Sequence, residues 1–300
     1  MQTLLKWTTI LVGLMVCGLF AAIIVVTLVI DPNQFKPLII SQFKQLTGFE
    51  MQIPGKLSWS FYPHLGMAAE EVSITEPAVF TSRLKNLVLR AKFRPLLHQQ
   101  LDFTKASIES LQINHLQASR VRARLSLKNQ VLELKQLSAD LYQGSLNAEA
   151  TVFLKTPSPN LHVVGKLNQV ALAELLEGLS GKSAKLQVKG RADLNWDVTT
   201  QGQKTEELLS HLNGSGQIQM AAGSLQGIDL AYFVNTAAAL INKEPLPQHP
   251  PGGGETQFGQ LSGTGLIKDG VISTNNLSLD SSFYTLKATG PLDLVNQTID

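Results

Sequence analysis

The stretch that decides the fold is residues 55–74, GKLSWSFYPHLGMAAEEVSI. Apolar side chains occupy every second position in two runs, which a Tyr-Pro-His segment separates. The alternating apolar positions include Leu57, Trp59, Phe61, Leu65 and Met67. A period of two is typical of β-strands with one apolar and one polar face. The stretch therefore predicts two strands joined by a turn, and it raises the question of what their apolar face buries.

Alternation of the same kind continues from Phe49 through most of the chain. The main runs occupy residues 87–93, 101–103, 121–127, 144–154, 161–167, 186–198, 216–222, 261–267, 271–279 and 283–294. Within a further run, Leu111 and Ile113 fall slightly out of phase with Ile108. The pattern predicts roughly fifteen strands, each with one apolar and one polar face. The fold class that we predict is therefore mainly β.

A few segments have helical spacing instead. Asp31-Pro32-Asn33 predicts a cap for a helix over residues 35–46, and residues 171–179 and 205–212 predict two short helices. Residues 228–243 predict a longer helix that is apolar on most sides and needs cover on more than one face. Either this helix is sandwiched within the domain or it closes the end of something open. The segment 245–254, PLPQHPPGGG, predicts a flexible loop.

The first thirty residues predict a membrane anchor. Residues 7–30 contain no charged side chain, and at about 1.5 Å per residue such a helix crosses a hydrocarbon core of about 30 Å. No small-x-small cleavage site follows, so we expect an uncleaved anchor rather than a secretory signal peptide. The short flank before the anchor favours a cytoplasmic N-terminus. Lys36 and Lys44 lie close enough to the bilayer to touch headgroups, unless their helix packs on the domain as a linker.

Cys17 is the only cysteine and lies inside this predicted anchor. Its neighbours loosely imitate a lipoprotein cleavage site, but the bulk of Val16 and the apolar run that follows favour an inert cysteine. A chain with a single cysteine has no internal disulfide and no thiolate metal site. This cysteine usage suits an extracytoplasmic domain.

The charge balance gives no reason to expect a nucleic-acid partner. The net charge is +2 and 16% of the residues are charged, against about 25% in typical domains, and Lys and Arg are dispersed rather than clustered. The nearest approach to a cluster is Arg120, Arg122 and Arg124, whose spacing places all three on one face of a strand. That face is either a solvated outer surface or a contact for an anionic headgroup or partner.

The residue types that carry catalysis are scattered. The histidines have no metal-ligand spacing and no partner in a recognisable site motif; they are His64, His98, His115, His162, His211 and His249. Gly214-Ser215-Gly216 lacks the spacing of a nucleophile elbow. We therefore predict that the protein is not an enzyme and has no cofactor or metal. A hydrolase with a β-rich envelope domain is the least favoured alternative.

Two groups of short motifs resemble the AsmA family of bacterial envelope proteins. The N-terminal group follows the anchor and reads Asp31-Pro32-Asn33-x-Phe35, Thr47-Gly48-Phe49 and Gly55-x-Leu57-x-Trp59-x-x-x-Pro63-x-Leu65. The C-terminal group reads Gly214-x-Gly216, Gly223-x-Leu225-x-Gly227-Ile228-Asp229-Leu230, Phe258-x-x-Leu261, Asp269-Gly270 and Leu277-x-Leu279. The order of these motifs, together with the anchor, makes the resemblance fairly specific. The middle of this chain is shorter than is usual for the family, and a further strand is expected after Asp300.

The resemblance implies a periplasmic protein held in the bacterial inner membrane by one N-terminal transmembrane helix. Its fold would be a long, curved, taco-like antiparallel β-sheet with a few short helices, related to bridge-like lipid transfer proteins. The concave surface would be a hydrophobic groove for phospholipid acyl chains, supporting outer-membrane lipid homeostasis and assembly. An outer-membrane or periplasmic protein is a further partner that this interpretation allows.

Four parts are expected along the chain on this interpretation. They are a cytoplasmic tip and transmembrane anchor (1–30), a juxtamembrane helix (31–48), an N-terminal AsmA-like β-groove (49–200) and a C-terminal AsmA-like module (201–300). The C-terminal module contains the predicted helix 228–243 and the loop 245–254.

The groove would be lined by apolar residues of the alternating strands. The predicted lining residues are Leu57, Trp59, Phe61, Leu65, Met67, Leu89, Leu125, Leu146, Val152, Val163, Val188 and Trp196. Too few helices are predicted to cover all the strands, which leaves a lipid-filled groove or closure into a sandwich or barrel. At about 4.8 Å per strand, a sheet of this size would extend about 70 Å. The alternative function is a non-enzymatic scaffold that assists outer-membrane protein assembly by contact, for which Arg122 on the outer face would matter.

Overall fold

The computed structural model describes most of the chain after residue 30. The described residues are 31–47, 49–60, 66–76, 80–91, 101–153, 158–181, 187–202, 205–249, 253–281, 284–293 and 298–299. The predicted transmembrane anchor, Phe61 and Leu65 lie outside these residues. Within the described ranges, no helix is both long enough and apolar enough to cross a membrane.

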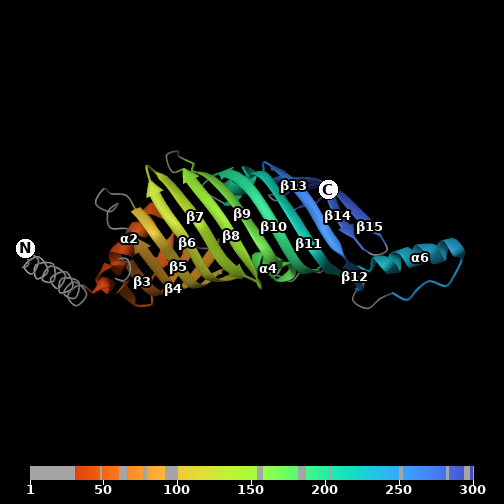
Figure 1. Cartoon of the computed structure of the whole chain (residues 1–300), viewed down its shortest axis with the longest axis horizontal. Helices are drawn as coiled ribbons and strands as arrows, with labels where there is room; N and C mark the ends of the chain where they lie inside the picture. The colour runs from red at the N-terminus through yellow and green to blue at the C-terminus, as the bar shows by residue number, and fades with distance from the viewer. Residues whose placement is uncertain are drawn as a thin grey trace, which may run out of the picture.

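One antiparallel sheet makes up nearly all of the described structure (Figure 1). It has sixteen strands within the described residues, and fourteen of them form one hydrogen-bonded path in chain order. β2 and β12 lie off this path and pair with β3 and β11. Every strand pair is antiparallel. The prediction of a mainly β chain with an antiparallel sheet and few helices is confirmed.

Most strands overlap one of the alternating runs of the sequence, although the strand at residues 131–141 lies outside all of them. The sixteen strands follow one another along the chain. They are β1 (Glu50–Gln52), β2 (Leu57–Ser60), β3 (Gly66–Glu76), β4 (Phe80–Ala91), β5 (Leu101–Ile113), β6 (Leu116–Lys128), β7 (Val131–Leu141), β8 (Gly144–Phe153), β9 (Asn160–Ala171), β10 (Gln187–Gln201), β11 (Asn213–Gln226), β12 (Glu255–Phe258), β13 (Gln260–Lys268), β14 (Val271–Asp280), β15 (Thr285–Asp293) and β16 (Thr298–Ile299). The stretch 55–74 supplies β2 and most of β3, in which Leu57 pairs with Ala69 and Trp59 with Met67. The sheet is continuous from β10 to β11, across the expected boundary at residue 200.

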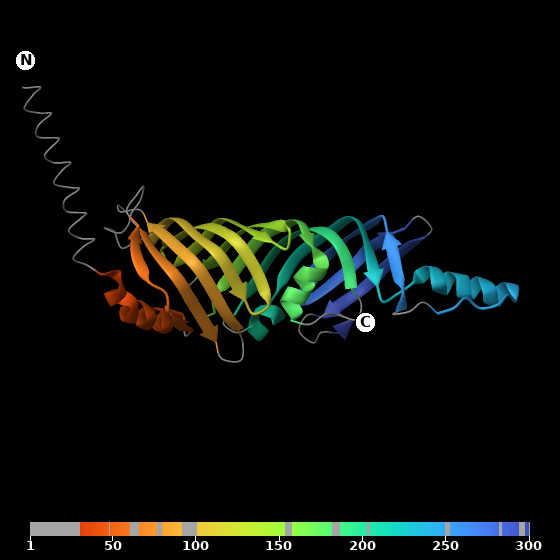
Figure 2. The same ribbon diagram turned by 90° about the horizontal axis from the view of Figure 1, so that it is seen from below.

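Bulges within the strands account for the curvature of the sheet. Inside the described strands, Asn86, Arg120, Gln136 and Gln169 have positive φ values between 49° and 53°. The register shifts beside Arg120, Gln136 and Gln169, as expected where one strand carries an extra residue. A bulge bends its strand and increases the local twist, and the sheet is correspondingly arched (Figure 2). The phase change that the sequence shows between Ile108 and Leu111 lies opposite the Arg120 bulge.

The arched sheet has one apolar and one polar face. Paired residues continue each face from strand to strand, as in the row Leu125, Leu134, Ala150, Val163 and Val198. The side of the sheet that carries this row is termed the inner face, and the opposite side the outer face. The larger buried cluster on the inner face includes Val121, Leu141, Leu167, Val170, Ala192, Met220, Phe258 and Leu279. A smaller cluster at the N-terminal end contains Ile53, Leu57, Ala69 and Val72.

Three short α-helices and one 3-10 helix lie beside the sheet and cover parts of it. α4 (Leu172–Ser180) buries Leu172 and Leu175 in the larger cluster and lies at the open side of the arch (Figure 2). At the N-terminal end, the 3-10 helix η1 (Pro32–Phe35) leads into α2 (Lys36–Thr47), which packs Ile39 and Ile40 against the smaller cluster. α5 (Thr205–Ser210) lies against β10. These helices occupy the segments in which the sequence predicts them, and α2 packs on the sheet as the linker interpretation expects.

α6 (Leu230–Asn242) departs from one of the two predicted arrangements. It projects beyond the sheet, at the end away from α2 (Figures 1 and 2). Phe233 is 57% exposed, Leu240 65% and Ile241 81%. The helix is therefore not sandwiched within the domain, and that alternative is wrong. The apolar composition of α6 correctly indicates a surface that another molecule or segment has to cover. Composition alone does not identify what covers it.

The open arrangement of the sheet follows from its strand order. The two ends of the strand path, β1 and β16, do not pair with each other. Among the described residues, the sheet has therefore not closed into a sandwich or a barrel.

Candidate functional site

Ten of the twelve predicted lining residues are described, and strand pairing places them on the inner face. They are Leu57, Trp59, Met67, Leu89, Leu125, Leu146, Val152, Val163, Val188 and Trp196. At the N-terminal end, Trp59, Met67 and Leu89 form one row across β2, β3 and β4. This row continues through Ala106 and Ala123 to the inner side of β6. The alternating pattern of the sequence thus becomes a continuous apolar surface.

The remaining lining residues lie over the centre of the sheet. Leu146 pairs with Leu167, and Val152 pairs with Leu161, both across the β8–β9 pair. Val188 packs against the larger buried cluster. Leu57 is buried with 5% exposure, while the other nine are half-buried. Their common position is a structural finding, and their contact with lipid stays a prediction.

Trp196 lies at the centre of the inner face, between a covered glycine and an open one. Its indole covers Gly165 on β9, where an added Cβ would lie 2.3 Å from the indole Cζ2. On the other side, Trp196 pairs with Gly216 of β11. An added Cβ at Gly216 would meet no atom closer than the Asn195 backbone oxygen at 3.6 Å. The inner face is therefore covered by the Trp196 indole at Gly165 and is open directly beside it at Gly216.

α4 is held at the edge of the inner face by a close approach to Tyr142. An added Cβ at Gly178 would lie 2.0 Å from the Tyr142 hydroxyl, so only glycine allows the helix to come this near. The backbone N–H of Gln117 donates to the same hydroxyl at 3.2 Å. Tyr142 therefore connects α4 to the start of β6 and fixes the position of the helix over the sheet.

The segment from Asp31 to Lys36 closes the N-terminal end of the inner face. The Asn33 side chain donates to the Leu57 backbone oxygen at 3.2 Å and accepts from the Leu57 N–H at 3.0 Å, while the Lys36 ammonium donates to the Gly55 oxygen at 2.8 Å. Asp31 accepts from the Asn33 backbone N–H at 2.9 Å and from its side-chain amide at 2.7 Å. These two bonds, assisted by the Lys36 charge, lower the pKa of the Asp31 carboxyl. The sequence predicted a cap here but not the pairing of Asn33 with β2.

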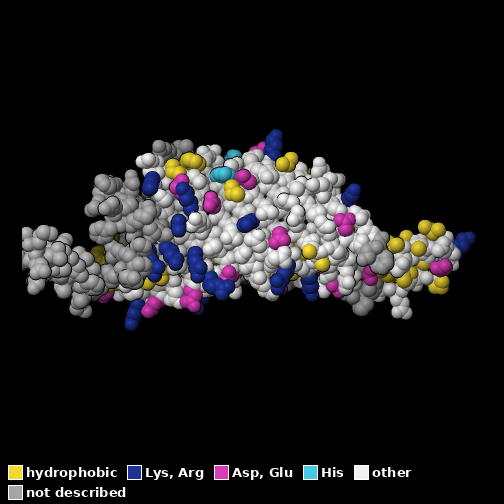
Figure 3. Space-filling model, in the orientation of Figure 1, with side chains coloured by type: hydrophobic (Ala, Val, Ile, Leu, Met, Phe, Trp, Pro, Cys, Tyr) yellow, Lys and Arg dark blue, Asp and Glu magenta, His cyan; other side chains and the backbone are white. Residues whose placement is uncertain are grey.

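The outer face carries polar side chains around a shallow depression that crosses several strands. One part, of about 550 Å³, is lined by Lys105, Arg122 and Arg124 together with Glu149. It adjoins parts of about 280 Å³ and about 540 Å³, with which it shares lining residues. None of these three cations forms an ion pair with a described residue. Figure 3 views the outer face, where Lys and Arg gather mainly over the N-terminal half of the sheet.

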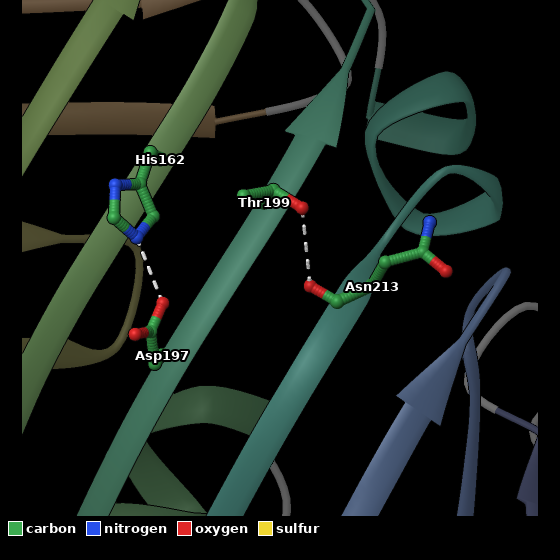
Figure 4. Close-up of polar contacts among 4 residues, drawn as sticks. All are labelled: His162, Asp197, Thr199 and Asn213. Atoms are coloured by element: carbon green, nitrogen blue, oxygen red, sulfur yellow. Dashed lines mark hydrogen bonds and ion pairs between the residues drawn. The ribbon is translucent and has the colours of Figure 1, made fainter.

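A histidine–carboxylate pair also lies on the outer face. Nε2 of His162 on β9 is 2.8 Å from Oδ1 of Asp197 on β10 (Figure 4). The Thr199 hydroxyl points toward the next strand, β11, where it donates to the Asn213 backbone oxygen at 3.5 Å. It is therefore not directed at His162. The histidine survey of the sequence missed this pair because its members are 35 residues apart. Throughout the described residues, no group of three or more His, Cys, Asp or Glu is placed to hold a metal.

Comparison with known proteins shows what the chain is similar to. A sequence profile of the AsmA family matches residues 1–116 and 102–277. Protein AsmA of Escherichia coli (strain K12) is 28% identical over 114 residues, which are 36% of this chain and 17% of that protein. The alignment therefore spans well under two thirds of the relative's length. No solved structure shows a significant match.

Proposed function

Because the chain belongs to the AsmA family, which is linked to envelope assembly, we propose that its inner face holds or passes phospholipid acyl chains. In this proposal, residues 7–30 anchor the protein in the inner membrane with the N-terminus in the cytoplasm. The bulk of the chain lies in the periplasm and supports the lipid homeostasis of the outer membrane. The protein acts without a cofactor and without catalysis.

The observation that carries this proposal is the continuous and incompletely covered apolar face. The row from Leu125 to Val198 crosses five neighbouring strands without a polar member. It continues through Gly214, Ile267 and Ile272 to β14. An acyl chain lying along this row would meet aliphatic side chains at every strand except β11, where the row contains Gly214.

The dimensions and energetics fit this use of the face. The path of fourteen strands extends about 60 Å at about 4.8 Å per strand. An acyl chain of one leaflet reaches about 15 Å, half of a hydrocarbon core of about 30 Å, so several fit in succession. Each methylene kept from water avoids a cost of about 0.8 kcal/mol. Similar aliphatic side chains at each strand hold no position much more strongly than the next, which favours sliding.

A charge placed on the inner face tests the proposal. A photoreactive residue, Val163→p-benzoylphenylalanine, reports bound lipid in intact cells grown with radiolabelled phosphate. In the full chain, Val152→Glu on the inner side of β8 is expected to reduce the phospholipid adduct several-fold, because a carboxylate covered by acyl chains loses its hydration at a high free-energy cost. Phe153→Glu is the matched control, since Phe153 is the next residue of the same strand and is 45% exposed. Equal adducts in the two charge variants, with both folded, would show that lipid at Val163 does not depend on the apolar surface at Val152, which would contradict the proposed groove.

A second candidate function is a scaffold that assists outer-membrane protein assembly by contact. The observation that favours it is the outer depression, whose cations Lys105, Arg122 and Arg124 form no ion pair with any residue that the structure describes. Under this alternative, Arg122→Glu lowers the amount of assembled outer-membrane protein, while Val152→Glu has no effect. Quantifying outer-membrane proteins and the lipid adduct in the same two strains separates the two functions.

A further inference from the structure

The C-terminal half of the molecule contains an arm that is fixed at its root. This arm, here named the distal arm, comprises residues 230–249, that is, α6 and the segment that returns beside it. Asp229 caps the helix by accepting from the Tyr232 N–H at 2.9 Å. Thr256 of β12, only 3% exposed, accepts from the Leu230 N–H at 2.9 Å and donates to the Ile228 oxygen at 2.7 Å. The arm therefore leaves the sheet in a defined direction.

The return segment covers one side of α6. Lys243 has a positive φ of 57° and turns the chain back, and the Glu244 N–H donates to the Ala239 oxygen at 2.9 Å. The His249 ring then lies edge-on to the Tyr232 ring, with centroids 5.1 Å apart. Ala239 is 6% exposed. One side of the helix is thus already packed within the arm.

The opposite side of the helix is an exposed apolar stripe. The stripe consists of Phe233, Val234, Ala237, Leu240 and Ile241, which recur at helical spacing. Val234 is 58% exposed, and Leu246 of the return segment adds another side chain at 58%. Exposed apolar side chains that gather on one side of a projecting helix indicate a surface that needs cover.

The charges of the arm favour a lipid surface as its occupant. From Leu230 to Asn242 the helix has no charged residue, and its polar residues are Asn235, Thr236 and Asn242. Ionisable groups flank the helix, with Asp229 before it and Lys243 and Glu244 after it. An uncharged helix with charges confined to its flanks enters the boundary of a bilayer without burying a charge. Its thirteen residues extend about 20 Å, too short to span about 30 Å of hydrocarbon but suitable for lying within the interface.

A second copy of the chain is a poorer occupant on grounds of area. A helix about 20 Å long and about 10 Å across has a footprint of about 200 Å². Even twice that area falls below the roughly 800 Å² per partner of a standard protein interface. A bilayer needs no complementary surface of matching size, so the same stripe is sufficient there.

We propose that the distal arm docks the end of the sheet into the interfacial region of a lipid bilayer, with its apolar stripe toward the acyl chains. The arm lies at the end of the sheet away from the N-terminal segment (Figures 1 and 2), so this contact differs from the expected anchor. Docking goes beyond the proposed function, and it holds whether or not lipid occupies the inner face. Because the arm has few cations, docking depends on apolar burial and not on anionic lipid.

Vesicle flotation of the full chain tests docking. The protein is placed in phosphatidylcholine nanodiscs, mixed with phosphatidylcholine vesicles or with phosphatidylethanolamine–phosphatidylglycerol vesicles, and floated through a density gradient. Co-flotation is expected with both vesicle types and in high salt. The double variant Leu240→Asp with Ile241→Asp is expected to lower it by at least about tenfold, since each aspartate is costly among acyl chains. Asn235→Asp, a charge on the same helix away from the stripe, is the matched control and should float like the parent.

Three results would overturn the proposal. One is the absence of flotation for the parent chain, and another is equal flotation of the stripe variant and the Asn235→Asp control. The third is efficient disulfide formation between two chains carrying Ile241→Cys and Cys17→Ser, which would show that a second copy covers the stripe. Circular dichroism verifies that the stripe variants stay folded. We expect this because the substituted side chains, Leu240 and Ile241, are exposed. Lipid cross-linking at Val163 is measured separately, so failure of docking and failure of the proposed function are distinguishable.

Discussion

The indole of Trp196 lies across Gly165 on the neighbouring strand, where an added Cβ would be 2.3 Å from the ring. The two residues are one pair in the β9–β10 register. The ring therefore lies low over the sheet and does not project away from it. At the adjacent pair, Gly216 leaves the space beside Trp196 open. Gly165 is thus covered by the indole, whereas Gly216 on the other side of the same tryptophan is open, and substitutions at the two glycines should differ in their effect on stability.

Gly165→Val is expected to destabilise the full chain by about 1–3 kcal/mol, because the new side chain displaces the indole. Gly216→Val is expected to change the stability by no more than about 0.5 kcal/mol, since the site is open and a strand tolerates valine. Urea denaturation followed by tryptophan fluorescence measures both. Equal destabilisation by the two variants would contradict the packing of Trp196 on Gly165.

Gly216→Trp is expected to obstruct the inner face without unfolding it. The photoreactive reporters for this test replace Leu125 and Ile267, which belong to one row on either side of β11. If lipid enters from the N-terminal end of the sheet, the phospholipid adduct falls at position 267 and stays unchanged at position 125. Unchanged adducts at both positions would show that lipid does not have to pass beside Gly216 to reach position 267.

Asn33→Ala is expected to loosen the N-terminal closure of the inner face. The substitution removes both hydrogen bonds to the Leu57 backbone, and each unsatisfied group costs about 1–3 kcal/mol where it is buried. Hydrogen exchange at the Leu57 amide should accelerate by at least about tenfold, which corresponds to about 1.4 kcal/mol. Exchange at Val163, far along the sheet, is the internal control and should not change.

The closure is also expected to depend on pH. The pKa of Asp31 lies below its ordinary value of 3.8 because the ionised form accepts the two Asn33 bonds. Its contribution to the stability of the segment is therefore fully present above the ordinary value and is lost as the pH falls through the lowered pKa. Protection of the Leu57 amide should decrease in this acidic range. Asp31→Asn should flatten the dependence, and an unchanged profile in that variant would assign the effect to another group.

Arg122→Glu is expected to leave the inner face intact. Arg122 lies in the outer depression, without an ion-pair partner among the described residues, so the stability should change by no more than about 0.5 kcal/mol. The phospholipid adduct at Val163 should equal that of the parent chain. A large loss of adduct would show that the outer face takes part in lipid loading.

The apolar face was predictable from the sequence because apolar and polar residues alternate within each strand. Leu146, Val152 and Val163 alternate with polar neighbours, and antiparallel pairing of consecutive strands then brings them to one side. The same local logic located α4 and the hairpin containing Trp59. The continuity of the face could be predicted from the alternation and from the pairing of consecutive strands alone.

The curvature and the contacts across strands were not predictable in this way. Arg120 and Gln136 adopt positive φ values that their residue types disfavour, so the surrounding sheet imposes them. His162 meets Asp197 only because the bulges set the register of β9 against β10. The exposure of Ile241 depends on where α6 leaves the sheet, which Thr256 determines from a strand later in the chain.

The most direct test of the central claim compares two adjacent residues of β9. Val163 lies on the inner face, and Val164, 42% exposed, lies on the outer face of the same strand. Each is replaced singly by p-benzoylphenylalanine in the full chain, and cells grown with radiolabelled phosphate are irradiated. The account predicts a strong phospholipid adduct at position 163 and little or none at position 164. Equal labelling at the two positions, or labelling at position 164 alone, would contradict it.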